Sequence, residues 1–338
     1  MRTGDQLATS SLGELTAERA PLPLRSRAGK SLSLVIPMHD EATGLSGLFE
    51  RLDTACEAFG LGVEILCVDD GSRDETLALL RGRAAEDSRI KIVALSRNFG
   101  KEAALTAGLE LAAGDLVVPL DADLQDPPEL IGTFLTLWEQ GFDVVYGIRT
   151  DRASDTPLKR WTANNFYRLF NLVADHPIPA NTGDFRLMDR AVVEVLKKLP
   201  ERNRFMKGLF AWVGFRQVGV PYARPARASG ATSWGYLKLS RFAIDGLTSF
   251  STAPLRVWTF VGVTAAVAAL AYAGFIMVRV MVIGRDIPGY ASIMVVVLLG
   301  FAVQMIALGV MGEYIGRMYQ EVKGRPIYTV RELIGFRA

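Results

Sequence analysis

Two carboxylates stand two residues apart directly after an apolar run, since Asp121 and Asp123 follow Leu116–Leu120. If that run is a strand, alternate residues share one side, so both carboxylates point the same way. Close carboxylates repel one another unless a cation or a proton lies between them. Hard oxygen ligands that share a site with phosphate suit Mg²⁺ or Mn²⁺, which would offset charge on a diphosphate leaving group. A surface turn carries the same tripeptide pattern, so this pair needs support from other residues.

Two more loops supply that support. Asp69 and Asp70 follow the apolar run Val63–Val68, where a carboxylate can accept a hydrogen bond from a base or a ribose hydroxyl. Capping of the next helix by Asp70 is the alternative, and both roles can hold at once. Arg97 and Lys101 follow a third run and could contact phosphate or pair with the nearby acidic groups.

The elements that must position these groups alternate along the chain. Apolar runs predict strands at Leu32–Pro37, Val63–Val68, Ile90–Leu95, Leu116–Leu120 and Asp143–Ile148. Helix-like stretches separate them, near 43–58, 74–86, 101–112 and 128–140. This alternation predicts an α/β fold with a mostly parallel sheet and helices on both faces. Ligands bind such sheets at the carboxyl ends of the strands, where the acidic groups fall.

The C-terminal part of the chain has a different composition. Val257–Val278 and Ile287–Gly312 hold 22 and 26 residues without a charged side chain. At a rise of about 1.5 Å per residue, each is long enough for a helix to cross a ~30 Å hydrocarbon core. We therefore expect a two-helix transmembrane hairpin over 257–314, with spans near 257–279 and 288–312, in place of buried soluble helices.

Composition and charge complete the expected organisation. The net charge of +2 across 338 residues argues against a nucleic-acid partner, and the two cysteines have no metal-like or disulfide-like spacing. Basic residues gather at the outer ends of the hairpin, so the positive-inside rule predicts a cytoplasmic catalytic domain in a multi-pass protein of the inner (plasma) membrane. The predicted units are a disordered tail 1–30, a catalytic domain 31–235, an amphipathic juxtamembrane helix 236–256, the hairpin, and a cytoplasmic tail 315–338.

Several motifs occur in a recognisable order: Val35-Ile36-Pro37, Asp40-Glu41, Val68 to Ser72, Asn98 to Lys101, and Asp121 to Pro128. In this order they resemble the family 2 glycosyltransferases with a GT-A fold. Within that family the chain is similar to the polyprenyl-phosphate sugar transferases, such as the bactoprenol glucosyltransferases and dolichyl-phosphate mannose synthases. The resemblance runs from about Ser31 to Arg325, and the segment 181–187 is more specific to this branch.

The resemblance implies roles for particular residues. Donor-binding roles are implied for Pro37, Glu41, Asp69, Asp70, Lys101, Asp121 and Gln125. The implied metal ligands are Asp121 and Asp123, holding Mg²⁺ or Mn²⁺. Catalytic roles are implied for Asp184, Asp123 and Arg186, and phosphate contacts for Arg149, Arg152, Lys159 and Arg186. The chain departs from the family pattern at His39-Asp40 and at Ser233, which affects the details of nucleoside and phosphate contacts.

The implied reaction is an inverting transfer of a sugar from a nucleotide-sugar, UDP-glucose or a related UDP-hexose, to polyprenyl phosphate such as undecaprenyl phosphate. A phosphate monoester is mostly dianionic near pH 7, so Asp184 is expected to orient groups more than to remove a proton. A GDP-mannose donor, a catalytically silent membrane scaffold and a processive polysaccharide synthase are the alternatives. The polysaccharide synthase is disfavoured because such enzymes usually carry a Q-x-x-R-W motif. In this chain Pro157 stands at the Gln position before Arg160-Trp161. A homo-oligomer, such as a tetramer, is also compatible with the resemblance.

Overall fold

The computed structural model describes residues 24–150, 182–202, 204–223, 253–283 and 289–336. Within them one sheet has the strand order β7-β5-β6-β4-β1-β2-β3-β8. The strands are β1 Ser31–Met38, β2 Gly62–Asp69, β3 Ile90–Leu95, β4 Leu116–Pro119, β5 Val144–Arg149, β6 Thr182–Asp189, β7 Gln217–Tyr222 and β8 Val330–Ile334. The helices are α2 Leu45–Phe59, α3 Thr76–Glu86, α4 Lys101–Leu111, η1 Pro128–Leu130, α5 Ile131–Glu139, α7 Arg190–Lys198, α8 Met206–Trp212, α10 Ala253–Ile283 and α11 Tyr290–Val322.

The centre of the sheet is parallel. β1 pairs in parallel with β2 and β4, and β2 pairs in parallel with β3. β6 runs antiparallel to both β4 and β5, and β8 runs antiparallel to β3. The predicted mostly parallel sheet is confirmed, and all five predicted strands are present within one residue at each end. The carboxyl ends of β1 to β4 therefore lie at one edge of the sheet.

Helices cover both faces of this sheet. One apolar core joins Leu34 of β1 to Phe49 of α2 and Phe134 of α5. The other joins Val35, the next residue of β1, to Leu105 of α4 and to side chains of α7 and α8. Neighbouring residues of a strand point to opposite faces, and both are apolar here because neither face meets water. This explains why the central strands read as continuous apolar runs.

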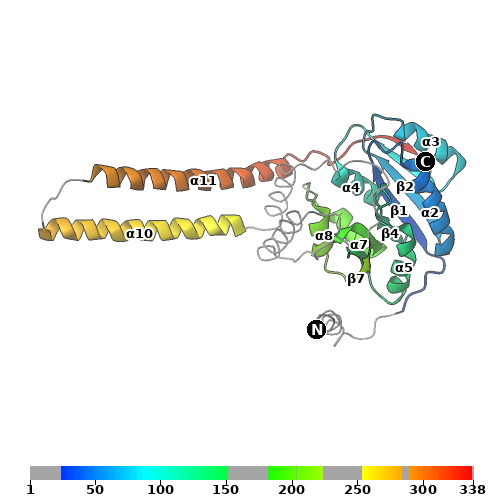
Figure 1. Ribbon diagram of the computed structural model, residues 1–338, viewed down its shortest axis with the longest axis horizontal. Coiled ribbons are helices and arrows are strands. Elements are labelled where there is room, and N and C mark those ends of the chain that lie inside the picture. Colours follow the sequence, from blue (N-terminus) through cyan, green and yellow to red (C-terminus); the bar gives the residue numbers. More distant parts are fainter. Residues whose placement is uncertain (1–23, 151–181, 203, 224–252, 284–288, 337–338) are drawn as a thin grey trace, which may run out of the picture.

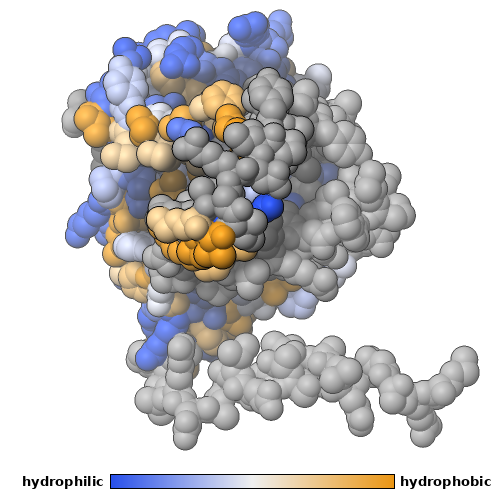
Figure 2. All heavy atoms as spheres, turned by 90° about the vertical axis from the view of Figure 1, so that its left-hand side faces the viewer, coloured by the Kyte–Doolittle hydropathy of each residue, from blue (hydrophilic) through white to orange (hydrophobic). Residues whose placement is uncertain are grey.

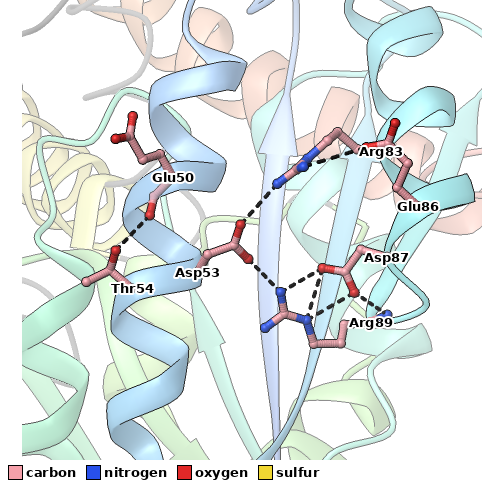
Figure 3. A network of polar contacts seen from close by, with 7 residues as sticks. All are labelled: Glu50, Asp53, Thr54, Arg83, Glu86, Asp87 and Arg89. Atoms are coloured by element: carbon pink, nitrogen blue, oxygen red, sulfur yellow. Dashed lines mark hydrogen bonds and ion pairs between the residues drawn. The ribbon is translucent and has the colours of Figure 1, made fainter.

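An ionic network joins α2 to the segment that leads into β3 (Figure 3). Asp53 of α2 pairs with Arg83 of α3 at 3.0 Å and with Arg89 at 2.5 Å, and Arg89 also pairs with Asp87 at 2.7 Å. These side chains are partly exposed, so each pair contributes at most about 1 kcal/mol. Asp87 and Arg89 directly precede β3, so the network braces the amino ends of the strands, away from the carboxyl edge.

The two C-terminal helices lie side by side and project away from the sheet (Figure 1). Val257–Ile276 and Leu299–Val322 have mean hydropathies of 1.9 and 1.4, and both are long and apolar enough to cross a membrane. Large side chains on α10 stay outside any core: Phe260 is 74% exposed and Met281 is 78% exposed. Hydrophobic atoms of the hairpin also face the viewer when it is seen end-on (Figure 2). A continuous apolar surface of this size needs a non-aqueous partner.

The sheet includes a strand that sequence reasoning missed. β8 lies within the segment expected to be a C-terminal tail, yet it pairs with β3 over Ile92↔Ile334 to Leu95↔Val330. α11 also continues to Val322, beyond the predicted end of the second span. The chain therefore returns from the hairpin and becomes an edge strand of the same sheet.

Ordered contacts also begin earlier than the predicted domain start at residue 31. Arg25 pairs with Asp143 at 2.5 Å and with Asp189 at 3.3 Å, and Arg27 pairs with Glu139 at 2.6 Å. Residues 24–30 thus fasten the start of β1 to the neighbouring layer. Most of the predicted tail 1–30 and nearly all of the predicted juxtamembrane helix 236–256 lie outside the described residues.

Candidate active site

The loops at the carboxyl edge of the sheet hold one another through side chain to backbone hydrogen bonds. The Asp40 carboxylate accepts from the Arg73 N–H at 2.7 Å, and the Ser72 hydroxyl accepts from the Asp40 N–H at 3.0 Å. Thr76 Oγ1 accepts from the Glu41 N–H at 2.9 Å. Asp40 has a φ of 55°, in the left-handed region that non-glycine residues seldom adopt. The loop after β1 is therefore held in a defined shape by the loop after β2.

Gly71 allows the loop after β2 to approach the loop after β3. Its φ is +67°, and a Cβ at this position would lie 2.5 Å from the carbonyl carbon of Arg97. Beside it, the Asp70 carboxylate accepts from the Phe99 N–H at 2.7 Å and the Gly100 N–H at 2.9 Å. Burial raises the pKa of Asp70 despite these donors. Asp70 thus fixes the start of α4, where Lys101 stands. The predicted alternative was that Asp70 caps the next helix, α3, whereas the observed contacts are made at the start of α4.

Lys101 joins two acidic groups that are far apart in the sequence. Its Nζ lies 2.6 Å from Asp121 Oδ1 and 2.8 Å from Asp184 Oδ2. These three residues come from the start of α4, the loop after β4, and β6. Burial alone would lower the pKa of Lys101, but the two carboxylates raise it well above its ordinary value. Of the two roles open to Lys101 from sequence, pairing with acidic groups is the one observed.

Asp184 is held as an anion by the cations around it. Burial would raise its pKa, but Lys101, Lys207 and Arg186 outweigh burial and place the pKa below the usual range. Its Oδ1 is buried and has no hydrogen-bond partner within the described residues. Glu102, the next residue after Lys101, is affected in the opposite direction: burial and then Asp184 raise its pKa to about 8.

Arg186 is buried, and the described part of the chain already satisfies much of its guanidinium. It donates to the Gly183 carbonyl at 2.9 Å and lies 3.8 Å from the centre of the Phe210 ring. Burial lowers its pKa to about 10, although Asp184 acts to raise it. In this position Arg186 supports the backbone and charge of Asp184. These contacts give Arg186 a positioning geometry.

The loop after β4 offers oxygen donors for a cation. Asp123 Oδ1 accepts from the Gln125 N–H at 3.2 Å, and Leu124 between them has a φ of 57°. Gln125 Oε1 is buried without a hydrogen-bond partner among the described residues. Asp121, Asp123 and this free amide oxygen fit a hard divalent cation. No cluster of three or more His, Cys, Asp or Glu residues is found in the described ranges, so substrate oxygens would complete the set.

A second polar cluster closes the side of the site near β5. Tyr222 of β7 donates a hydrogen bond to Asp126, which is 1% exposed, and accepts one from Arg149 Nε at 3.3 Å. Asp126 in turn raises the pKa of Arg149 against the opposing effect of burial. A Cβ on Gly183 would lie 2.6 Å from the Arg149 guanidinium, so glycine leaves room for that group. Arg149 is therefore held at the end of β5 next to the acidic loop.

Most of the site residues predicted from sequence meet at this edge. Pro37 and Glu41 lie at the end of β1 and in its loop, and buried Asp69 ends β2 and accepts from the Ser72 N–H at 3.2 Å. Arg152 and Lys159 lie outside the described residues. Sequence reasoning missed Glu102, Lys207 and Tyr222. Glu102 follows Lys101 directly and could have been found as a second charge at the start of a helix, but nothing local marks the other two.

A parallel-centred sheet with acidic loops at its carboxyl edge defines the GT-A class of sugar transferases. Residues 33–197 match the model of Glycosyl transferase family 2. The chain is 52% identical over 304 residues to an uncharacterized glycosyltransferase of Synechocystis sp., covering 90% of this chain and 96% of that protein. The chain belongs to glycosyl transferase family 2, and it is a glycosyltransferase.

Two further likenesses were found. The SfII prophage-derived bactoprenol glucosyl transferase of Shigella flexneri is 43% identical over 301 residues, covering 89% of this chain and 97% of that protein. The crystal structure of mannosyl-3-phosphoglycerate synthase from Rubrobacter xylanophilus has 22% identity and a TM-score of 0.44, covering 78% of this chain and 80% of that one.

Proposed function

We propose that this enzyme transfers a hexose from a nucleotide-sugar, UDP-glucose or a related UDP-hexose, to polyprenyl phosphate at the cytoplasmic face of the inner membrane. One observation carries the proposal: α11 leads through the short segment 323–329 into β8, an edge strand of the sheet that presents Asp121 and Asp184. An acceptor whose tail stays in the bilayer needs an active site fixed close to the membrane. The bactoprenol glucosyl transferase name of the 43% identical relative supports this acceptor class.

The arrangement of the hairpin supports the proposed side of the membrane. α10 and α11 are antiparallel neighbours, and their domain-side ends point toward the domain that holds the sheet (Figure 1). Because β8 pairs with β3, the segment after the hairpin and the catalytic sheet must lie on the same side. The basic residues at the outer ends of the hairpin favour the cytoplasm as that side.

On the donor side, we assign the nucleoside to Pro37, Glu41 and Asp69, with Asp70 positioning their loops. Asp121 and Asp123, with the free Gln125 Oε1, would hold Mg²⁺ or Mn²⁺. A bound cation of this kind supplies charge neutralisation for the diphosphate leaving group. Lys101 adds a fixed positive charge beside Asp121, and Arg149 adds another at the end of β5.

On the reacting side, Asp184 acts as an orienting anion in an inverting single displacement. The acceptor phosphate is mostly dianionic near pH 7 and does not need a strong base. A carboxylate whose pKa is lowered by neighbouring cations is also a weak base. Asp184 therefore fixes Lys101, and Arg186 in turn fixes Asp184. Alignment of two anionic partners then makes a large contribution to the rate.

The test is a donor screen with the full-length protein in membranes that contain undecaprenyl phosphate. Labelled UDP-glucose, UDP-galactose, UDP-N-acetylglucosamine and GDP-mannose are supplied in turn, and lipid-linked product is measured. We expect product from UDP-glucose or another UDP-hexose. Product from GDP-mannose alone would replace the donor assignment, and no lipid-linked product from any donor would contradict the proposal.

A further inference from the structure

A cavity of about 710 Å³ lies where the chain returns from the second apolar helix to the catalytic sheet. The start of α4 forms one wall, Arg202, Arg204 and Phe205 form a second, and the segment 319–327 at the end of α11 forms the third. Lys101 and Glu102 belong to the first wall. We name this space the exit cavity. It connects the end of a membrane-length helix to the residue that bridges Asp121 and Asp184.

The lining of the exit cavity is strongly cationic. Its basic side chains are Lys101, Arg202, Arg204, Lys323 and Arg325. Glu102 is the one acidic residue among the described residues of the lining, and burial raises its pKa to about 8. Concentrated positive charge in a partly enclosed space attracts and holds anions.

Arg204 is a fixed cation of the exit cavity. Its side chain is 9% exposed, and it donates to the carbonyls of Leu196 at 3.2 Å and Leu199 at 2.9 Å. Its Nε has no hydrogen-bond partner among the residues that the structure describes. Arg204 is thus a cation of the lining that two backbone carbonyls hold in place.

Apolar and aromatic side chains stand among the cations on all three walls of the exit cavity. Phe99, Phe205, Tyr319, Pro326 and Ile327 line it beside the cations. Lys323 lies 5.3 Å from the centre of the Tyr319 ring, so charge and aromatic surface are adjacent. A free phosphate would use only the cations, whereas a phosphate that carries a hydrocarbon chain would use both surfaces. The end of α11 places this mixed lining at the expected membrane boundary.

Long-range contacts keep the cavity walls together. Glu321 accepts from the Arg202 N–H at 3.0 Å, and the Arg202 guanidinium donates to the Arg325 carbonyl. Tyr328 donates a hydrogen bond to Glu110 on α4. The second apolar helix is therefore fastened to the helix that carries Lys101.

We propose that the exit cavity binds the phosphate monoester of the polyprenyl acceptor, with Lys323, Arg325 and Arg204 holding the phosphate and the aromatic side chains holding the first isoprenyl units. The proposal rests on the proposed function and adds a location and residues for its acceptor. A phosphate monoester carries a charge near −2 at pH 7, which matches the excess of cations. From this cavity, Lys101 provides the connection to Asp184.

The test is the Lys323→Gln and Arg325→Gln double variant of the full-length protein. We expect the KM for polyprenyl phosphate to rise by about tenfold or more, the effect of losing at least one charge-assisted contact. The affinity for UDP should stay unchanged, because these residues lie outside the acidic loops. Arg331→Gln is the matched control: it removes an exposed cation of β8 that does not line the cavity. Thermal unfolding checks that all variants fold.

The assay is run in vesicles of purely zwitterionic lipid and again in vesicles with anionic lipid. A rise in KM in both supports the proposal, whereas a rise confined to anionic vesicles indicates general surface attraction and overturns it. A loss of UDP affinity with an unchanged acceptor KM would place the donor in the cavity and also overturn it.

Direct binding separates this inference from the proposed function. A short-chain isoprenyl phosphate and inorganic phosphate are each titrated into the protein without a donor. Tighter binding of the isoprenyl phosphate, weakened in the double variant, supports the proposal even if no donor gives product. Equal binding of the two ligands indicates a free-phosphate site, and binding that the double variant leaves unchanged contradicts the assignment.

Discussion

The donor side and the exit side of this enzyme are built in different ways. On the donor side, short loops after β1, β2, β3 and β4 hold one another through contacts such as Asp70 with the Phe99 and Gly100 N–H groups. On the exit side, the contacts join distant parts of the chain: Arg202 and Glu321 are 119 residues apart, and Glu110 and Tyr328 are 218 apart. Donor chemistry is therefore encoded in contiguous motifs, whereas the acceptor side depends on how the whole chain returns to the sheet.

The difference predicts which perturbations act on one side alone. Changes in the acidic loops should alter nucleotide and metal binding without altering the acceptor KM. Changes in the C-terminal segment should alter the acceptor KM without altering nucleotide and metal binding. Removal of everything after residue 256 cannot test this, because it also deletes β8 and uncovers β3. Single substitutions on each side are cleaner.

The largest expected effect is metal removal. Treatment with EDTA should lower sugar transfer by more than about 10³-fold, because charge on the leaving diphosphate would lose its counterion. Mg²⁺ or Mn²⁺ added in excess should restore the rate. Asp123→Asn should shift the activating concentration of metal upward while the acceptor KM stays constant. Full activity in the presence of chelator would show that Lys101 and Arg149 alone neutralise the leaving group.

The second prediction concerns the residue where the two sides meet. Asp184→Asn should lower kcat by about 10²–10³-fold, because Lys101 would lose one of its two anchors. The pKa of Asp184 lies below its ordinary value, so the group stays ionised from about pH 5 upward. A plot of kcat against pH for the native enzyme should therefore show no change caused by titration of Asp184 between pH 6 and 8.

Glu194→Gln, which alters a partly exposed carboxylate of α7, is the control for Asp184→Asn. It should leave kcat unchanged. If the Asp184→Asn variant keeps a near-native kcat above pH 7 and loses it below pH 6, Asp184 is instead a general base. That result would move Asp184 from an orienting role to a proton-transfer role.

Sequence reasoning located the acidic edge of the sheet because its determinants are local. Apolar runs that end in acidic motifs located β1 to β5 and placed Asp69, Asp121 and Asp123 at one edge. The bridging role of Lys101 was open, because a cation at the start of a helix does not reveal which carboxylates approach it. β8 was missed because it follows a long apolar helix, and only its pairing with β3 distinguishes it from a tail. The positive φ of Leu124 likewise has no signal in residue type.

The third prediction sharpens the definition of the donor side. Gly71→Ala would place a Cβ 2.5 Å from the Arg97 carbonyl carbon at a φ of +67°. The left-handed conformation alone costs about 1–2 kcal/mol with a Cβ present, so the loops must shift. We expect UDP affinity, measured by calorimetry, to fall by about tenfold while the acceptor KM stays unchanged.

Gly62→Ala is the matched control for Gly71→Ala, because a Cβ there would meet nothing within 4 Å. It should leave both constants unchanged. Equal losses of UDP affinity in the two variants would show that the effect does not come from the contact between the loops after β2 and β3.

The smallest expected effect tests the exit side through a single hydroxyl. Tyr328→Phe removes the hydrogen bond to Glu110 that fastens the C-terminal segment to α4. Loss of one hydrogen bond to a charged group should lower the free energy of unfolding by about 1.5–3 kcal/mol. The sheet itself should stay intact in this variant. The acceptor KM should rise by about twofold to threefold, since the exit cavity loses part of its support, and UDP affinity should not change. Tyr272→Phe, which alters an exposed residue of α10, provides the control. If Tyr328→Phe weakens UDP binding as much as it raises the acceptor KM, the two sides are mechanically coupled through α4, and the division into separately built halves is wrong.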